Sequence, residues 1–319
     1  MQYFDVFNGD ADGICALHQM RLAEPRQSTL VTGVKRDINL LKKVQASAGD
    51  SVLVLDISLD KNRDDLLRLL QADADILYFD HHFSGDIPDH AHLNTHINTD
   101  PNTCTSLLVN QHLNQRYLPW AVTAAFGDNL HQSARTAATP LALSENQLQQ
   151  LELLGTCINY NGYGSSLEDL LFTPDELYRK ISHYENPFEF IETDNNYQTL
   201  VNGYQEDLAK AESRKPAYES ASHSITILPN EKWARRVSGV YANALATANP
   251  DRAHALLTQQ QGGSFLVSVR APLNNKTGAD ELCRQFETGG GRKAAAGINK
   301  LAESDYDRFV EKFSQAFTS

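Results

Sequence analysis

The chain has 319 residues, 41% of them hydrophobic, and a formal net charge of −12. This length predicts two domains, and the negative charge argues against sequence-independent binding to long nucleic acid through a broad basic surface. No apolar run is long enough to span a membrane and the N-terminus lacks a secretory pattern, so we expect a cytoplasmic protein without a membrane partner.

The first predicted elements are a short strand and a helix that enclose two carboxylates. A strand pattern from Tyr3 to Phe7 runs into Asp10 and Asp12, and helical spacing follows over residues 14–22. Asp12 alone reads equally well as a helix N-cap. Two like charges so close together at a strand end repel each other unless a cation lies between them, so the pair favours a cation site.

Strand and helix patterns then alternate. We expect a strand at 28–34, a short helix at 38–44, a strand at 51–55, a helix at 66–70 and a strand at 75–80. The continuous apolar run at 51–55 suits a central strand that is covered on both faces. The alternation predicts βαβ units and therefore an α/β fold with a doubly wound, mostly parallel sheet.

Metal-binding side chains gather at the carboxyl ends of these strands, where ligands bind in such sheets. Three strand ends carry them: Asp10, Asp12, Asp56, Asp80, His81 and His82. For any one of these residues alone, a role as a helix cap or turn residue is favoured over a role as a metal ligand. Together they predict a metal cluster.

The rest of the first domain is predicted to be helical. Helical patterns cover residues 103–115, 119–130, 141–160 and 173–210, and Asp128 lies in the second of them. Charges and Pro216 interrupt the pattern at 212–218, which predicts a first domain at 1–211 and a second at 212–319, joined by a helical linker. Residues 1–215 hold 16 Lys+Arg against 30 Asp+Glu, and residues 216–319 hold 12 against 10, so the negative charge lies in the first part.

The second domain is predicted to be a smaller α/β unit with an anion-binding stretch. Gly289, Gly290 and Gly291 are followed at once by Arg292 and Lys293. Consecutive glycines let a backbone approach a ligand and point N–H groups at it, and the two cations add charge. A flexible surface loop is the alternative for a glycine run. Arg270, at the end of a predicted strand, offers a second anion contact.

The ordered set Asn8-Gly-Asp10-Ala-Asp12-Gly13, Asp56, Asp80-His81-His82, Gly127-Asp128 and the glycine run resembles the DHH phosphoesterase family with its DHH-associated C-terminal domain. The resemblance implies hydrolysis of phosphodiester or phosphoanhydride bonds with two manganese ions, magnesium being the alternative metal. It implies metal-binding roles for Asn8, Asp10, Asp12, Asp56, His81 and Asp128, with Asp56 bridging the ions. It implies that Asp80 orients its histidine neighbours and that His82 faces the phosphate. It implies substrate binding by Arg270, Gly289, Gly290, Gly291, Arg292 and Lys293.

Two departures from the family pattern concern the metals and the substrate. Many relatives carry a histidine ligand shortly before the first Asp, whereas this chain offers only the neutral amide of Asn8. Where relatives have a histidine after the glycine run, this chain has Arg292, whose planar fork suits phosphate or a guanine edge.

The resemblance implies one of several phosphate ester or anhydride substrates, and the two-domain length and net negative charge of this chain favour a short 5′-phosphorylated oligoribonucleotide over a long strand. Our hypothesis within that class is a linear dinucleotide such as pGpG. One alternative is a nucleoside bisphosphate or polyphosphate as substrate of the same enzyme class. The other is a nucleotide-binding protein that has lost catalysis, which the missing histidine near Asn8 motivates. Nothing in the sequence indicates the oligomeric state.

Overall fold

The computed structural model describes residues 1–318. They divide into two compact units, one comprising Met1–Gly203 and the other beginning at Tyr204. Among the described residues, no helix is both long and apolar enough to cross a bilayer.

The first unit contains a five-stranded sheet in the order β2-β1-β3-β4-β5, with every neighbouring pair parallel. Its strands are β1 (Tyr3–Phe7), β2 (Thr29–Val31), β3 (Ser51–Leu55), β4 (Asp75–Asp80) and β5 (Leu93–Ile97). All but the first residue of β1 and of β3 are buried, as expected of central strands covered on both faces. The predicted parallel sheet is confirmed.

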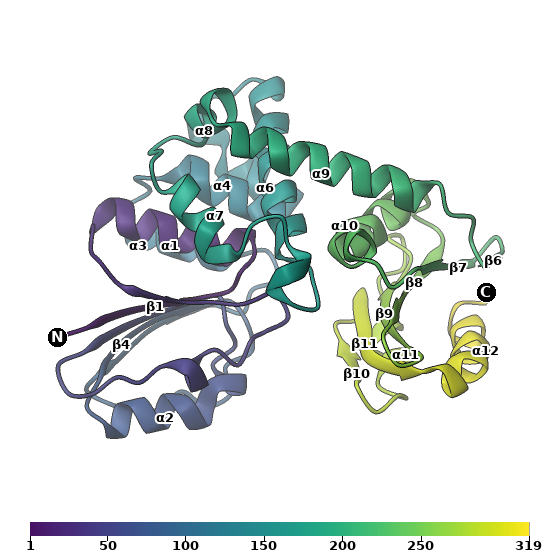
Figure 1. The fold of residues 1–319 in the computed structure, drawn as a ribbon, viewed down its shortest axis with the longest axis horizontal. Coiled ribbons are helices and arrows are strands. Elements are labelled where there is room, and N and C mark those ends of the chain that lie inside the picture. Colours follow the sequence, from purple (N-terminus) through teal and green to yellow (C-terminus); the bar gives the residue numbers. More distant parts are fainter. Residues whose placement is uncertain (319) are drawn as a thin grey trace. The chain divides into compact units, whose positions relative to one another are not determined.

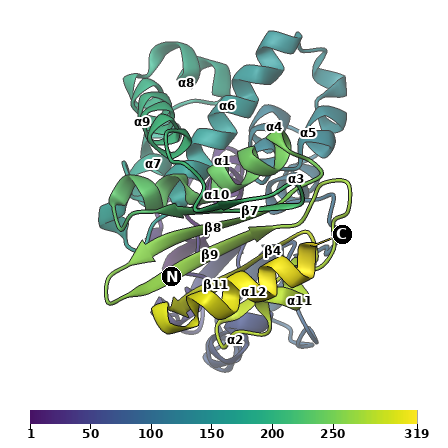
Figure 2. The same ribbon diagram turned by 90° about the vertical axis from the view of Figure 1, so that its right-hand side faces the viewer.

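Helices cover both faces of this sheet (Figure 1). Helix α2 (Arg63–Gln71) packs Leu66, Leu69 and Leu70 into the core on one face. On the other side of the sheet lie α1 (Ala11–Ala23), α3 (Thr105–His112), α4 (Leu118–Gly127), α5 (His131–Ala137), α6 (Glu145–Gly162), α7 (Pro174–Ile181) and α8 (Pro187–Thr193) (Figures 1 and 2). The unit is therefore doubly wound.

The helical stretch predicted at 173–210 consists of three helices, α7, α8 and α9 (Asn195–Glu212). Pro174 and Pro187 each stand at the first helical position, where the missing N–H costs nothing. The break between α7 and α8 follows, because a proline begins a helix well and cannot continue one.

The second unit has a mixed six-stranded sheet in the order β10-β11-β9-β8-β7-β6. Its strands are β6 (Tyr218–Glu219), β7 (His223–Leu228), β8 (Ala253–Gln260), β9 (Ser264–Arg270), β10 (Gly289–Gly291) and β11 (Ala295–Ala302). Helix α10 (Lys232–Ala248) lies on one face, and α11 (Ala279–Cys283) and α12 (Tyr306–Phe317) lie on the other (Figure 2). Phe309 and Phe313 of α12 are fully buried in the core of that face.

The sequence prediction missed three strands of this sheet, β6, β10 and β11. The glycine run was expected as a loop, yet Gly289–Gly291 forms β10 and pairs antiparallel with β11. Runs of glycine and alanine carry no apolar alternation, so their strand character comes from pairing with neighbouring strands rather than from their own side chains.

Candidate metal centre

Asp10 lies in the turn between β1 and α1 and Asp12 in the first turn of α1, so the helix N-cap is Asp10 and not Asp12. Asp10 is the N-cap of α1, and its Oδ1 accepts hydrogen bonds from the backbone N–H groups of Asp12 and Gly13, each at 3.1 Å. A Cβ at Gly13 would lie 2.2 Å from the carbonyl oxygen of Asn8, so this tight turn requires glycine there. In a sheet of this order the switch point lies between β1 and β3, and this turn stands at it.

The N-terminus of α3 holds Asp12. Its Oδ2 accepts the N–H of Thr105 and its Oδ1 accepts the N–H of Ser106, both at 2.7 Å. The free N–H groups at the start of α3 thus bind this carboxylate. Neutral donors and the positive end of a helix dipole fix the carboxylate while leaving its negative charge available to a cation.

Asp56 follows β3 in a left-handed backbone conformation, with φ of 59°. Its Oδ1 accepts a hydrogen bond from the Thr105 hydroxyl at 3.1 Å. Aspartate tolerates this conformation better than a branched residue does, so the chain can turn sharply at the end of the strand and keep a carboxylate there.

His81 is oriented for metal binding by a backbone carbonyl. Its Nδ1 lies 2.9 Å from the carbonyl oxygen of Thr103 and therefore donates, which makes Nε2 the nitrogen that can ligate a metal. Nε2 lies 3.5 Å from Asp56 Oδ1, 3.7 Å from Asp128 Oδ2 and 4.0 Å from Asp12 Oδ2. Four elements of the sheet and helix layer thus converge on one point.

Asp80 and His82 form the neighbouring pair. His82 Nδ1 lies 2.7 Å from Asp80 Oδ1 and 3.8 Å from Asp56 Oδ1. Asp80 is fully buried, whereas 35% of the His82 side chain is exposed. This arrangement suits the predicted division in which Asp80 orients the ring and His82 faces outward; the contact with a phosphate stays a prediction.

Two groups of side chains in the described chain are arranged to hold a cation. One is Asp12, His81 and Asp128, the other Asp56, His81 and His82, and in each group the ligand atoms lie within 4.8 Å of one another. A set of carboxylate oxygens with an imidazole nitrogen suits Mn²⁺. Mg²⁺ prefers a ligand set with fewer nitrogen atoms. The donor chemistry of Asp12, Asp56, His81 and Asp128 therefore fits a divalent ion.

The electrostatics of the cluster also favour a cation. Burial, followed by repulsion from Asp12, Asp10 and Asp128, raises the pKa of Asp56 well above its usual range. Burial also raises the pKa of Asp128. Burial and mutual repulsion thus disfavour the ionised forms of Asp56 and Asp128, and a divalent ion would offset both effects.

The sequence prediction missed Lys35, which lies on the other side of the cluster. Its Nζ is 2.5 Å from Asp10 Oδ2, 2.8 Å from Asn159 Oδ1 and 3.6 Å from Asp128 Oδ1. Burial raises the pKa of Asp10, but attraction to Lys35, the hydrogen bond from Lys35 and the N–H of Gly13 act together against it, so the pKa of Asp10 is lowered. A lysine shortly after a strand adjacent to β1 is a weak signal, and it becomes informative only once the strand order is known.

Asn8 lies beside this pair and is 4% exposed. Its side-chain Oδ1 is buried without a hydrogen-bond partner in the described chain. The structure thus brings Asn8, Asp10, Asp12, Asp56, Asp80, His81, His82 and Asp128 together, and metal binding by any of them stays a prediction.

The predicted substrate-binding residues lie in the second unit. Arg270 ends β9 and its Nε donates to Asn243 Oδ1 at 2.8 Å. Arg292 and Lys293 are exposed in the turn between β10 and β11. A Cβ at Gly289 would lie 1.7 Å from the carbonyl oxygen of Cys283, so glycine is required there by packing. No Cβ contact arises at Gly290, and a ligand contact by any of these residues stays a prediction.

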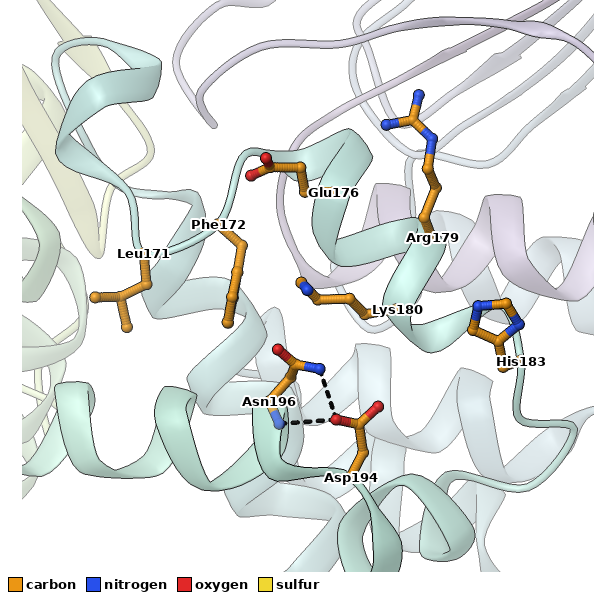
Figure 3. Close-up of a pocket in the computed structure, with 8 residues that line it drawn as sticks. All are labelled: Leu171, Phe172, Glu176, Arg179, Lys180, His183, Asp194 and Asn196. Atoms are coloured by element: carbon orange, nitrogen blue, oxygen red, sulfur yellow. Dashed lines mark hydrogen bonds between the residues drawn. The ribbon is translucent and has the colours of Figure 1, made fainter.

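A hollow of about 630 Å³ lies elsewhere in the first unit. Lys180 projects into it with its Nζ 4.9 Å from the centre of the Phe172 ring, and Asn196 donates to Asp194 on its wall (Figure 3). The residues that line it are Leu171, Phe172, Glu176, Arg179, Lys180, His183, Asp194 and Asn196. It contains no residue of the metal cluster.

Comparisons with known proteins establish the fold. No family model matches the sequence. No curated protein matches it either. Among solved structures, the exonuclease RecJ bound to manganese has a TM-score of 0.64 and 16% identity, over 99% of this chain and 90% of that one.

Two further structures are similar. The DHH domain of a member of the s1p family of ribosomal proteins has a TM-score of 0.65 and 14% identity, over 98% of this chain and 86% of that one. The pGpG-specific phosphodiesterase PggH from Vibrio cholerae has a TM-score of 0.57 and 14% identity, over 99% of both chains. This chain therefore has the fold of DHH-domain proteins, which confirms at the level of the fold the resemblance that its motifs indicate.

Proposed function

We propose that this protein is a metal-dependent phosphodiesterase that hydrolyses short 5′-phosphorylated oligoribonucleotides, with linear dinucleotides such as pGpG as preferred substrates. The observation that carries the proposal is the position of His81 Nε2, which faces carboxylates from three different elements at 3.5–4.0 Å while its Nδ1 is fixed by a backbone carbonyl. Such convergence serves a cation, because three carboxylates repel one another without one.

Asp12, Asp56, His81 and Asp128 would hold the divalent ion. When bound, manganese or magnesium would supply positive charge to the phosphoryl oxygens and lower the pKa of a water molecule. The protein itself has to hold these ligands in place. The N–H groups of Thr105 and Ser106 do so for Asp12, and the Thr103 carbonyl does so for His81.

Asp80 and His82 have a proton-handling role in this proposal. Asp80 Oδ1 accepts a hydrogen bond from His82 Nδ1–H, which fixes the tautomer and leaves Nε2 as the ring nitrogen that can exchange a proton with the substrate. Hydrolysis of pGpG adds a water oxygen to the bridging phosphorus and breaks the bond from phosphorus to the ribose O3′. That oxygen takes up a proton, and two molecules of GMP result.

The dinucleotide hypothesis draws on two further observations. PggH, a pGpG-specific phosphodiesterase, has this fold over 99% of both chains. In the second unit, Arg292 and Lys293 are exposed in one turn, which gives that unit an edge able to bind a phosphate or a guanine.

The proposal is tested by incubating the purified protein with manganese and pGpG, pApA, longer 5′-phosphorylated oligoribonucleotides, and guanosine bisphosphate. We expect GMP from pGpG fastest, and no reaction after chelation of the metal. Equal rates on both dinucleotides would remove the guanine preference, and faster release of phosphate from guanosine bisphosphate would favour that substrate class instead. Tight binding of pGpG without turnover would identify a binding protein.

The replacement Asp56→Asn is expected to lower kcat/KM on pGpG by about a thousandfold, which corresponds to about 4 kcal/mol of transition-state stabilisation. Asparagine keeps an oxygen for the Thr105 hydroxyl and tolerates the left-handed backbone, so the fold should persist. Asp75→Asn is the matched control, because Asp75 is exposed at the other end of β4. Equal activity in Asp56→Asn and the control would contradict the proposed centre.

A further inference from the structure

We propose that the ammonium group of Lys35 replaces one of the two cations that the motifs predict, so that the centre takes a single divalent ion, held by Asp12, Asp56, His81 and Asp128. This inference rests on the proposed function and refines it. It concerns the half of the cluster that Asp10 and Asn8 occupy.

The contacts of Lys35 are those of a cation in a carboxylate site. Its Nζ lies 2.5 Å from Asp10 Oδ2, 2.8 Å from Asn159 Oδ1 and 3.6 Å from Asp128 Oδ1. All three partners offer oxygen. The Asp10 side chain is 3% exposed and that of Lys35 is 21% exposed, so water screens this ion pair only partly.

The backbone around Lys35 is built to place this ammonium. The N–H of Lys35 donates to the carbonyl oxygen of Gly162 at 2.8 Å, which fixes the segment after β2 against the end of α6. A Cβ at Gly9 would lie 2.0 Å from the carbonyl oxygen of Gly33, so the two turns touch through glycine. The close approach of these segments holds Lys35 at the cluster, whereas a lysine on a mobile surface segment would not be held there.

Asp10 and Asp12 differ in whether their negative charge is already paired with a cation. Both carboxylates are buried, and both accept backbone N–H groups. The donors of Asp12 are neutral and leave its charge to a divalent ion. The second oxygen of Asp10 is hydrogen-bonded to the ammonium group at 2.5 Å, so a divalent ion on that carboxylate would be strongly repelled by it. Asp128 differs, because its Oδ1 is 3.6 Å from the ammonium group and its other oxygen, Oδ2, faces His81 Nε2 at 3.7 Å.

The other possible ligands near Asp10 do not compensate for the loss of Asp10 as a metal ligand. In the described chain neither group of residues arranged for a metal includes Asp10. Asn8 offers one neutral amide oxygen, and residues 1–10 contain no histidine. A divalent ion here would therefore have to displace Lys35 or bind weakly.

The test counts manganese in the whole protein and does not depend on turnover. We would dialyse the purified protein against manganese, measure the bound metal per chain by mass spectrometry, and record the electron paramagnetic resonance spectrum. The wild type is expected to bind one ion and to give the resolved six-line spectrum of an isolated Mn²⁺. Lys35→Met is expected to bind a second ion, with a spectrum broadened by coupling between the two.

Lys43→Met is the matched control for charge, because Lys43 pairs with Asp37 at 2.7 Å on the surface and its side chain is 40% exposed. It should bind one ion, like the wild type. A second pair of variants covers the case in which Lys35→Met does not fold. Asp12→Asn should weaken manganese binding about tenfold or more, whereas Asp10→Asn, which keeps the cap, should leave the affinity within about threefold.

Two coupled ions in the wild type would overturn the role of Lys35 and leave the proposed phosphodiesterase intact. Equal weakening of manganese binding by Asp10→Asn and Asp12→Asn would also overturn it. A wild type that binds no manganese at all would overturn the proposed function itself, and this inference with it. The failures of the two proposals are thus distinguishable.

Discussion

The carboxyl edge of the parallel sheet and the glycine-rich hairpin of the second unit differ in what fixes their residues. At the sheet edge, Asp10, Asp12 and Asp56 follow two different strands and are each at most 2% exposed. At the hairpin, Arg292 and Lys293 are consecutive and exposed. The first arrangement exists only because the chain folds, whereas the second exists already in the sequence.

The difference affects how each feature should be interpreted. Buried carboxylates brought together by separate elements cost free energy, so their convergence indicates a function that repays it. Exposed cations in one turn cost little, and their presence alone indicates less. Glycines at such a turn have a competing explanation in packing, which can be tested directly.

Gly289→Ala is expected to destabilise the protein by about 4 kcal/mol or to prevent the second unit from folding. The added Cβ would lie 1.7 Å from the carbonyl oxygen of Cys283, and a backbone atom cannot move aside cheaply. Gly290→Ala is the matched control, since its Cβ would meet nothing within 4 Å, and its stability should change by less than about 1 kcal/mol. Urea unfolding followed by circular dichroism measures both. Similar midpoints for the two variants would remove the packing explanation for Gly289.

Much of the sheet edge could be predicted from sequence because its signals are local. Apolar runs mark β1, β3 and β4. Asp56 and His81 directly follow β3 and β4, and Asp10 comes three residues after the end of β1. A parallel sheet then brings the carboxyl ends of its strands to one edge whatever the loops between them do. The structure brings these residues together as the sequence predicted.

Lys35 could not be predicted, because its role depends on strand order and on loop packing. It follows the short edge strand β2, whose place beside β1 is a tertiary fact. Asn159, its second partner, lies near the end of α6, far along the chain. The strands β10 and β11 were missed for a related reason, because glycine and alanine runs acquire strand character only by pairing.

The stability of the protein should also depend on pH through His18. This buried residue lies on α1, the helix that Asp10 caps. Burial lowers the pKa of His18 from 6.5 to about 4. Its Nε2 lies 2.8 Å from the carbonyl oxygen of Tyr184, to which it donates. Between about pH 6.5 and 4 the unfolded chain binds a proton there that the folded chain does not, so His18 lowers stability as the pH falls, by up to about 3 kcal/mol.

The measurement is the free energy of unfolding of wild type and His18→Gln at pH 7 and pH 5. The variant should lose less stability over this interval than the wild type, because glutamine does not titrate and can still donate to the Tyr184 carbonyl. His183→Gln, at an exposed position, is the control and should follow the wild type. Parallel pH profiles for wild type and His18→Gln would contradict the burial argument.

The exposed turn between β10 and β11 is tested by Arg292→Ala, for which we expect the smallest effect. If the turn between β10 and β11 binds the substrate, losing this guanidinium should raise KM for pGpG about tenfold, or about 1.4 kcal/mol, with kcat nearly unchanged. Arg284→Ala is the matched control, because Arg284 is an exposed arginine of the same unit that pairs with Asp280 at 3.3 Å. Since Arg292 is exposed, its removal should not alter stability, and the two variants can be compared at equal folded fractions. If KM is the same in both variants, the two cations are surface charges, and substrate recognition has to be sought at residues that folding brings together, as it does at the metal centre.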